Sequence, residues 1–124
     1  MFRKSFFLLT ILALAALLHY AQDEKKATKV TGYLIDNACA TGLDAKDKEH
    51  MVSCSLSPRC VASGYAVVSK DTLYKLDDNG NKLALQVLRK TKVQRGLTVA
   101  AEGTIKDGIL HVETMAEVPG AGTP

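Results

Sequence analysis

Short stretches of alternating or β-branched apolar residues recur along this chain, and they predict five strands. The predicted strands are residues 30–36, 65–69, 72–76, 97–105 and 109–118. An apolar stripe at helical spacing, formed by Leu83, Ala84, Val87 and Leu88, predicts one helix over residues 81–92. The order is therefore strand, insertion, strand, strand, helix, strand, strand.

Turn residues separate these elements. The Asp-Asp-Asn-Gly sequence at 77–80 predicts a turn that ends the third strand, and Lys-Asp-Gly at 106–108 predicts a hairpin. Gly32 and Gly103 lie inside predicted strands, where a glycine often marks a bulge or the tight bend of a small barrel. The insertion at 37–59 is polar and irregular; residues 45–54 favour a short helix that Pro58 should limit.

Five short strands with a helix between the third and the fourth are the element order of an OB fold. We therefore expect a mainly β protein, a five-stranded OB-like barrel with one helix between strands 3 and 4. A Cys/His-containing insertion follows strand 1.

A short motif accompanies this order. Residues 32–39 form a Gly-x-hydrophobic-hydrophobic-Asp-x-x-Cys opening, the insertion carries His and Cys residues, and the fourth strand contains Val99, Gly103 and Ile105. In these features the chain resembles a group of small exported bacterial proteins of unknown function with an OB-like domain. The resemblance implies the fold and the compartment, and it attaches no activity.

The N-terminal residues predict export. Arg3 and Lys4 precede an apolar run at 6–18, which has the length of a signal-peptide core and is short for a membrane span. We expect a signal peptide at 1–21, a flexible leader at 22–28, one OB-like domain at 29–118 and a flexible tail at 119–124. The mature protein would be periplasmic or extracellular; an uncleaved membrane anchor and a buried N-terminal helix are the alternatives.

Composition and charge narrow the function. The chain has 124 residues with 47% apolar and 23% charged residues, which excludes a disordered, collagen-like or multi-span membrane protein. Its net charge of +3 falls to +1 when Arg3 and Lys4 leave with the signal peptide. A nearly neutral domain argues against a nucleic-acid partner. We expect an unidentified envelope ligand or protein as partner, and membrane contact only through an uncleaved signal segment.

Three cysteines and one histidine are the candidates for metal binding or disulfide formation. If residues 49–54 are helical, His50 and Cys54 share one face, and Cys39 can approach it from the end of the first strand. With Cys60, these residues would form a tetrahedral Cys3His site suited to zinc or to copper(I). Asp36 would accept a hydrogen bond from His50 and orient it.

Disulfide formation is the competing hypothesis. An exported protein keeps disulfides, so Cys39, Cys54 and Cys60 could form one bridge, in any of three pairings, and leave one thiol free. No Cys-x-x-Cys pair is present to favour thiol-redox activity, and no hydrolase or nucleotide-binding motif occurs. The leading hypothesis is a non-enzymatic OB-fold binding or accessory module of the bacterial envelope, with a disulfide in its insertion. The alternatives are a zinc- or copper-binding protein and a thiol-redox protein.

Overall fold

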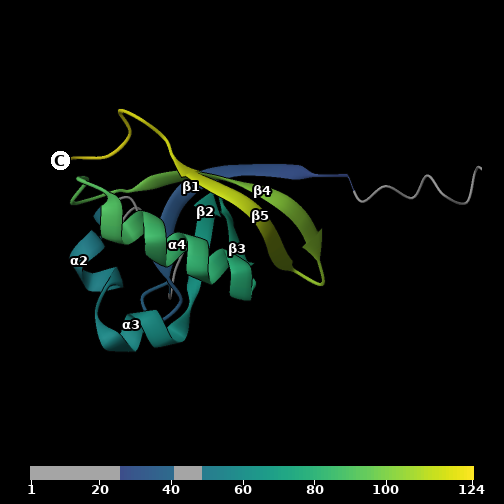
Figure 1. Ribbon diagram of the computed structural model, residues 1–124, viewed down its shortest axis with the longest axis horizontal. Helices are drawn as coiled ribbons and strands as arrows, with labels where there is room; N and C mark the ends of the chain where they lie inside the picture. Colours follow the sequence, from purple (N-terminus) through teal and green to yellow (C-terminus); the bar gives the residue numbers. More distant parts are fainter. Residues whose placement is uncertain (1–25, 41–48) are drawn as a thin grey trace, which may run out of the picture.

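A computed structural model describes residues 26–40 and 49–124 and contains a closed five-stranded barrel, in the order β1-β2-β3-β5-β4 (Figure 1). The strands are β1 (Thr28–Asp36), β2 (Tyr65–Ser69), β3 (Thr72–Leu76), β4 (Thr98–Lys106) and β5 (Ile109–Glu117). Neighbouring strands are antiparallel except β3 and β5, which pair in parallel. The prediction of a mainly β, OB-like barrel with a helix between the third and fourth strands is confirmed.

Two glycines let the strands curve into a barrel. β1 pairs with β4 through residues 28–33 and with β2 through residues 33–36, so the strand changes partners next to Gly32. A β-carbon at Gly32 would clash with the carbonyl oxygen of Val68. The β4–β5 register shifts between Glu102 and Gly103, and a β-carbon at Gly103 would clash with the carbonyl of His111. The predicted bend and bulge are confirmed at these positions.

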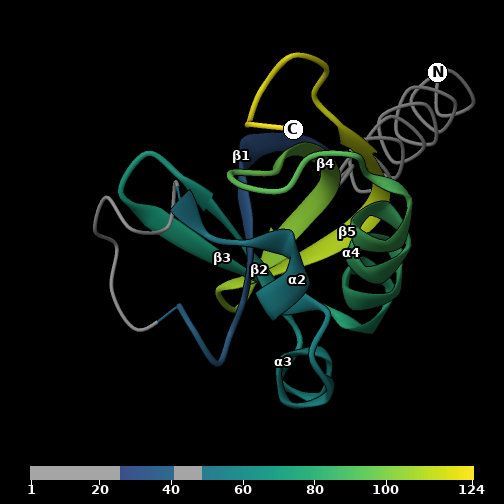
Figure 2. The same cartoon turned by 90° about the vertical axis from the view of Figure 1, so that its left-hand side faces the viewer.

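The helix α4 (Asp78–Lys90) begins earlier than the sequence pattern predicts. Its N-cap is Asp77, whose Oδ1 accepts a hydrogen bond from the backbone N–H of Gly80 at 2.8 Å. The same oxygen accepts from the N–H of Val112 on β5 at 3.1 Å. The predicted turn at 77–80 is therefore wrong: these residues form the capped first turn of a helix. α4 packs beside β5 and buries Ala84 and Leu88 (Figure 2).

Two short helices replace the single helix predicted at 45–54. They are α2 (Val52–Ser55) and α3 (Pro58–Ser63), while residues 45–48 lie outside the described part. Pro58 stands in the first turn of α3, where its missing N–H costs nothing, so it starts a helix instead of limiting one. Both helices lie on one side of the barrel, away from the β4–β5 hairpin (Figure 1).

The barrel interior is apolar. It is filled by buried residues from every strand and from α4: Val30, Leu34, Tyr65, Val67, Leu76, Ala84, Leu88, Val99, Ala101, Leu110 and Val112. In the tail predicted to be flexible, the backbone of Thr123 pairs with Arg95. The predicted signal peptide lies outside the described residues. None of the helices within 26–40 and 49–124 has the length and apolar character to cross a bilayer.

Candidate metal centre

The site is built around the carboxylate of Asp36, the last residue of β1, which is fully buried. Its Oδ1 lies 2.8 Å from Nε2 of His50 and accepts a hydrogen bond from the Ser55 hydroxyl at 3.0 Å. Its Oδ2 accepts from the backbone N–H of Cys39 at 3.0 Å. The thiols of Cys39 and Cys60 also act on this carboxylate and lower its pKa. One buried carboxylate therefore gathers hydrogen-bond donors from residues before position 41 and after position 48.

These donors set the charge of the site. Burial by itself would raise the pKa of the Asp36 carboxyl. Hydrogen bonds from Cys60, Cys39, His50 and Ser55 outweigh burial and hold that pKa below its ordinary value. Asp36 is consequently a buried anion at neutral pH, and it attracts groups that can donate a proton or carry positive charge.

Cys39 lies in the turn that follows β1. The backbone N–H groups of Cys39 and Ala40 donate to the Asp36 carbonyl at 3.2 and 3.1 Å, which reverses the chain and brings the Cys39 thiol back to the Asp36 carboxylate. Burial, the Asp36 carboxylate and Cys60 together raise the pKa of the Cys39 thiol to about 12. In the metal-free protein Cys39 is a neutral thiol.

His50 is positioned by residues distant in sequence. Its carbonyl accepts from Gly96 at 3.1 Å, and the N–H of Val52 donates to the carbonyl of Gln94 at 2.9 Å. Behind that segment, Arg95 pairs with Thr123 near the C-terminus. His50 therefore stands before α2, not on it. The predicted helical face shared by His50 and Cys54 does not exist, because pairing with Arg95 extends the chain at Met51.

The arrangement places three different metal-ligating atoms together. A carboxylate oxygen of Asp36, the sulfur of Cys39 and an imidazole nitrogen of His50 all lie within 4.8 Å of one another. Ligand atoms around a tetrahedral zinc ion stand about 3.3–3.8 Å apart, given its usual bond lengths. The three atoms need only small shifts to bind one ion. The sulfur of Cys60 lies outside this group of three, but it interacts with Asp36 and Cys39.

The fold brings some of the predicted site residues together and leaves others apart. Cys39 and His50 meet, Cys60 is buried beside them, and Cys54 is exposed on α2 outside the cluster. Asp36, predicted only to orient His50, stands among the ligand atoms themselves. The predicted disulfide is not formed in this structure, where all three cysteines are free thiols.

Ser55 was not predicted from the sequence, where nothing marks it. It is buried in α2, its hydroxyl lies 3.0 Å from Nε2 of His50, and its carbonyl accepts from the Tyr65 hydroxyl at 2.8 Å. Burial, Asp36 and Cys60 raise the pKa of Tyr65 to about 12, so this hydroxyl stays a donor. Through this hydrogen bond, Tyr65 on β2 helps to hold Ser55 in position.

Ser55, His50 and Asp36 do not form a hydrolase triad. In a triad, one imidazole nitrogen faces the carboxylate and the other faces the serine. Here the same Nε2 contacts both Oδ1 of Asp36 and the Ser55 hydroxyl, which itself donates to Asp36. Ser55 is therefore a structural donor to the carboxylate, with no base to activate it.

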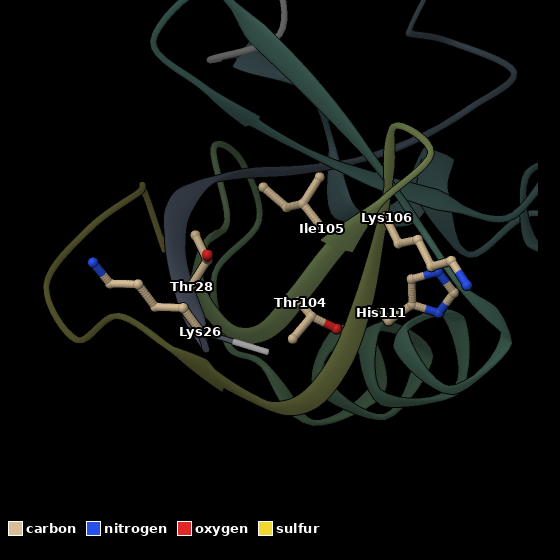
Figure 3. A pocket seen from close by; sticks show the side chains of 6 residues that line it. All are labelled: Lys26, Thr28, Thr104, Ile105, Lys106 and His111. Atoms are coloured by element: carbon tan, nitrogen blue, oxygen red, sulfur yellow. The ribbon is translucent and has the colours of Figure 1, made fainter. Parts of the chain in front are cut away.

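Apart from the Asp36 cluster, a hollow of about 400 Å³ lies near the β4–β5 hairpin. It is lined by Lys26, Thr28, Thr104, Ile105, Lys106 and His111. Figure 3 shows Lys26 pointing to one side, while Lys106 and His111 lie together at the other. These basic groups do not converge on one point, and Nδ1 of His111 lies 3.5 Å from Asp77. The Asp36 cluster is the stronger candidate.

No protein-family model matches the chain, and neither the curated proteins nor the solved structures contain a match to it. The resemblance to small exported OB-like proteins stays a prediction.

Proposed function

We propose that this chain is a small exported protein of the bacterial envelope that binds one zinc ion through Asp36, Cys39, His50 and Cys60. The observation that carries the proposal is the convergence of a carboxylate, a thiol and an imidazole within 4.8 Å. The anion at its centre is buried and already surrounded by donors, so a cation there would find ligands that are held in place.

The mixture of ligand atoms favours zinc over copper. Zinc accepts carboxylate oxygen, imidazole nitrogen and thiolate sulfur in tetrahedral sites, whereas copper(I) prefers soft sulfur ligands. The buried carboxylate of Asp36 is a hard ligand at the centre of the cluster. Copper binding is therefore the less favoured of the two ions predicted from the sequence.

The ion would act as a cross-link. Cys39, His50 and Cys60 belong to the insertion between β1 and β2, and Asp36 ends β1. One ion held by all four would fasten the insertion to the barrel, the role that the sequence assigned to a disulfide. Four protein ligands leave no open position for a substrate, which supports a binding or accessory role over catalysis.

Metal titration tests the proposal. The reduced, metal-free chain should bind one zinc ion in competition with a chromophoric chelator, and native mass spectrometry should show a single adduct. His50→Ala should weaken binding by more than about 100-fold, because loss of a ligand exceeds the usual cost of losing a group behind a ligand.

Two variants serve as matched controls. His111→Ala and Cys54→Ser remove the same residue types outside the cluster, and both should bind zinc like the parent chain. Circular dichroism would check that each variant is folded. Unchanged affinity in a folded His50→Ala chain, or a loss with Cys54→Ser equal to that with His50→Ala, would contradict the proposed ligand set.

A further inference from the structure

We propose that Cys39 and Cys60 form a disulfide under oxidising conditions, and that this bond switches off metal binding at the Asp36 cluster. The inference rests on the proposed function and adds its regulation. Of the three possible pairings, the geometry points to one, and it consumes both sulfur ligands of the metal.

The helix α3 is fastened to the turn that carries Cys39. The Ser63 hydroxyl accepts from the N–H of Ala38 at 3.1 Å and donates to the carbonyl of Cys60 at 2.7 Å. The side-chain amide of Asn37 donates to the carbonyl of Ser63 at 2.9 Å, and its backbone N–H donates to Gly64 at 2.9 Å. Three hydrogen bonds thus join residues 37–38 to Ser63 and Gly64 at the end of α3, and a fourth, within α3, ties Ser63 to Cys60.

The hydrogen bonds between residues 37–38 and the end of α3 bring the two thiols near each other. Cys60 lies one helical turn before Ser63, and Cys39 directly follows Ala38. Each cysteine is therefore close in sequence to a residue that makes these hydrogen bonds. Both thiols lower the pKa of the Asp36 carboxyl, and Cys60 contributes to the raised pKa of Cys39, so the three groups are neighbours. A disulfide requires its two cysteines on neighbouring backbone segments, and these hydrogen bonds hold the segments of Cys39 and Cys60 together.

Cys54 has no such neighbour. It is exposed on α2 and belongs neither to the group of ligand atoms nor to the groups that act on Asp36 or Cys39. The bridge between Met51 and Arg95 holds the residue that precedes α2, so the start of this helix is fixed by a distant part of the chain.

The reaction is thiol–disulfide exchange with a disulfide oxidant. Cys39 is exposed and Cys60 is buried, so the oxidant reaches Cys39 first. Once Cys39 has lost its proton, its thiolate attacks the oxidant, forms a mixed disulfide and releases the first oxidant thiol. Cys60 then attacks the Cys39 sulfur and releases the second oxidant thiol. The two protein thiols lose two electrons and two protons, and the oxidant disulfide gains them as two thiols. Export would expose the pair to such oxidants, so oxidant and zinc would compete for the same two thiols.

Peptide mapping identifies the bond, because trypsin separates the three cysteines. Cleavage after Lys29, Lys46, Lys48, Arg59 and Lys70 places Cys39 in peptide 30–46, Cys54 in 49–59 and Cys60 in 60–70. The metal-free full chain is treated with oxidised glutathione and mapped. Peptide 30–46 should be joined to 60–70, while 49–59 carries a free or glutathionylated thiol. A bridge that includes peptide 49–59 would overturn the inference.

Zinc titration of the same samples tests the switch. The oxidised chain should bind zinc at least about 100-fold more weakly than the reduced chain, and dithiothreitol should restore binding. Cys54→Ser should behave like the parent. Cys60→Ser lacks the partner thiol, so the oxidant should add at most glutathione to its Cys39. Equal zinc affinity before and after bridging would overturn the switch alone. A reduced chain that binds no zinc would overturn the proposed function and the switch with it.

Discussion

The Nε2 atom of His50 lies 2.8 Å from Oδ1 of Asp36 and 3.0 Å from the hydroxyl of Ser55. A carboxylate only accepts hydrogen bonds, so Nε2 carries the proton in the metal-free protein. The Asp36 side chain is 0% exposed and that of His50 is 14% exposed. The imidazole therefore covers a buried anion. A metal ion bound between His50 and Asp36 would displace the proton on Nε2.

Replacing Asp36 should weaken the fold as well as the site. Asp36→Asn keeps the shape but turns one acceptor into a donor that faces His50, Ser55 or the N–H of Cys39. We expect the free energy of unfolding to fall by at least about 3 kcal/mol, since hydrogen bonds to charged groups contribute most. Urea denaturation measures it. Asp107→Asn, in an exposed turn at φ 53° that asparagine tolerates, should change it by less than about 0.5 kcal/mol.

The same residue predicts acid sensitivity. The pKa of Asp36 is lower in the folded chain than its ordinary value of 3.8, so ionisation of this carboxyl favours the folded state. That stabilisation is present above the ordinary pKa and is lost as the pH falls below it. The difference in unfolding free energy between the parent and Asp36→Asn should therefore shrink from pH 6 towards pH 2. A difference that stays constant over this range would contradict a lowered pKa.

Much of the fold follows from local sequence. Alternation marks the strands, and Gly32 and Gly103 stand where backbones approach too closely for a β-carbon. The start of α4 was predicted wrongly because Asp-Asp-Asn-Gly is both a turn signal and a helix-cap signal. The deciding contact, from Asp77 to Val112, joins residues 35 positions apart, which no local pattern contains.

The site was predictable only in part, for a similar reason. Residue type alone selects Cys39, His50 and Cys60, and the short spacing from Cys39 selects Asp36. A helical spacing added Cys54, but the conformation at His50 and Met51 is set by Gln94, Arg95 and Gly96 across the molecule. Ser55 has no signal in the sequence, because its role depends on burial against Asp36.

The close approach at Gly32 predicts a position-specific effect. Gly32→Ala should reduce the free energy of unfolding by about 3 kcal/mol, because the added methyl group meets the backbone of Val68 and not a movable side chain. Gly108→Ala is the control: its φ of 75° is unfavourable for alanine, but nothing lies within 4 Å. That change should cost about 1 kcal/mol. Equal losses in thermal or urea unfolding would contradict the steric argument.

The C-terminal residues should support metal binding from a distance. The carbonyl of Thr123 accepts from Gln94 at 2.8 Å and from Arg95 at 3.2 Å, and this segment holds the backbone beside His50. A chain that ends at Gly120 should bind zinc about tenfold more weakly, the effect expected when a group behind a ligand is lost. Thr123→Ala keeps the backbone groups and should bind normally. Unchanged affinity in the truncated chain would instead agree with the flexible tail predicted from sequence.

Zinc binding should release a proton from Cys39. Burial, the Asp36 carboxylate and Cys60 raise the pKa of this thiol to about 12, so zinc must displace its proton at any lower pH. The logarithm of the zinc affinity should rise by at least about one for each pH unit between about pH 7 and 8.5. Calorimetry in buffers of different ionisation enthalpy counts the protons. Cys39→Ser should release one proton fewer and Cys54→Ser the same number. An unchanged count in Cys39→Ser would show that Cys39 does not bind the ion as a thiolate.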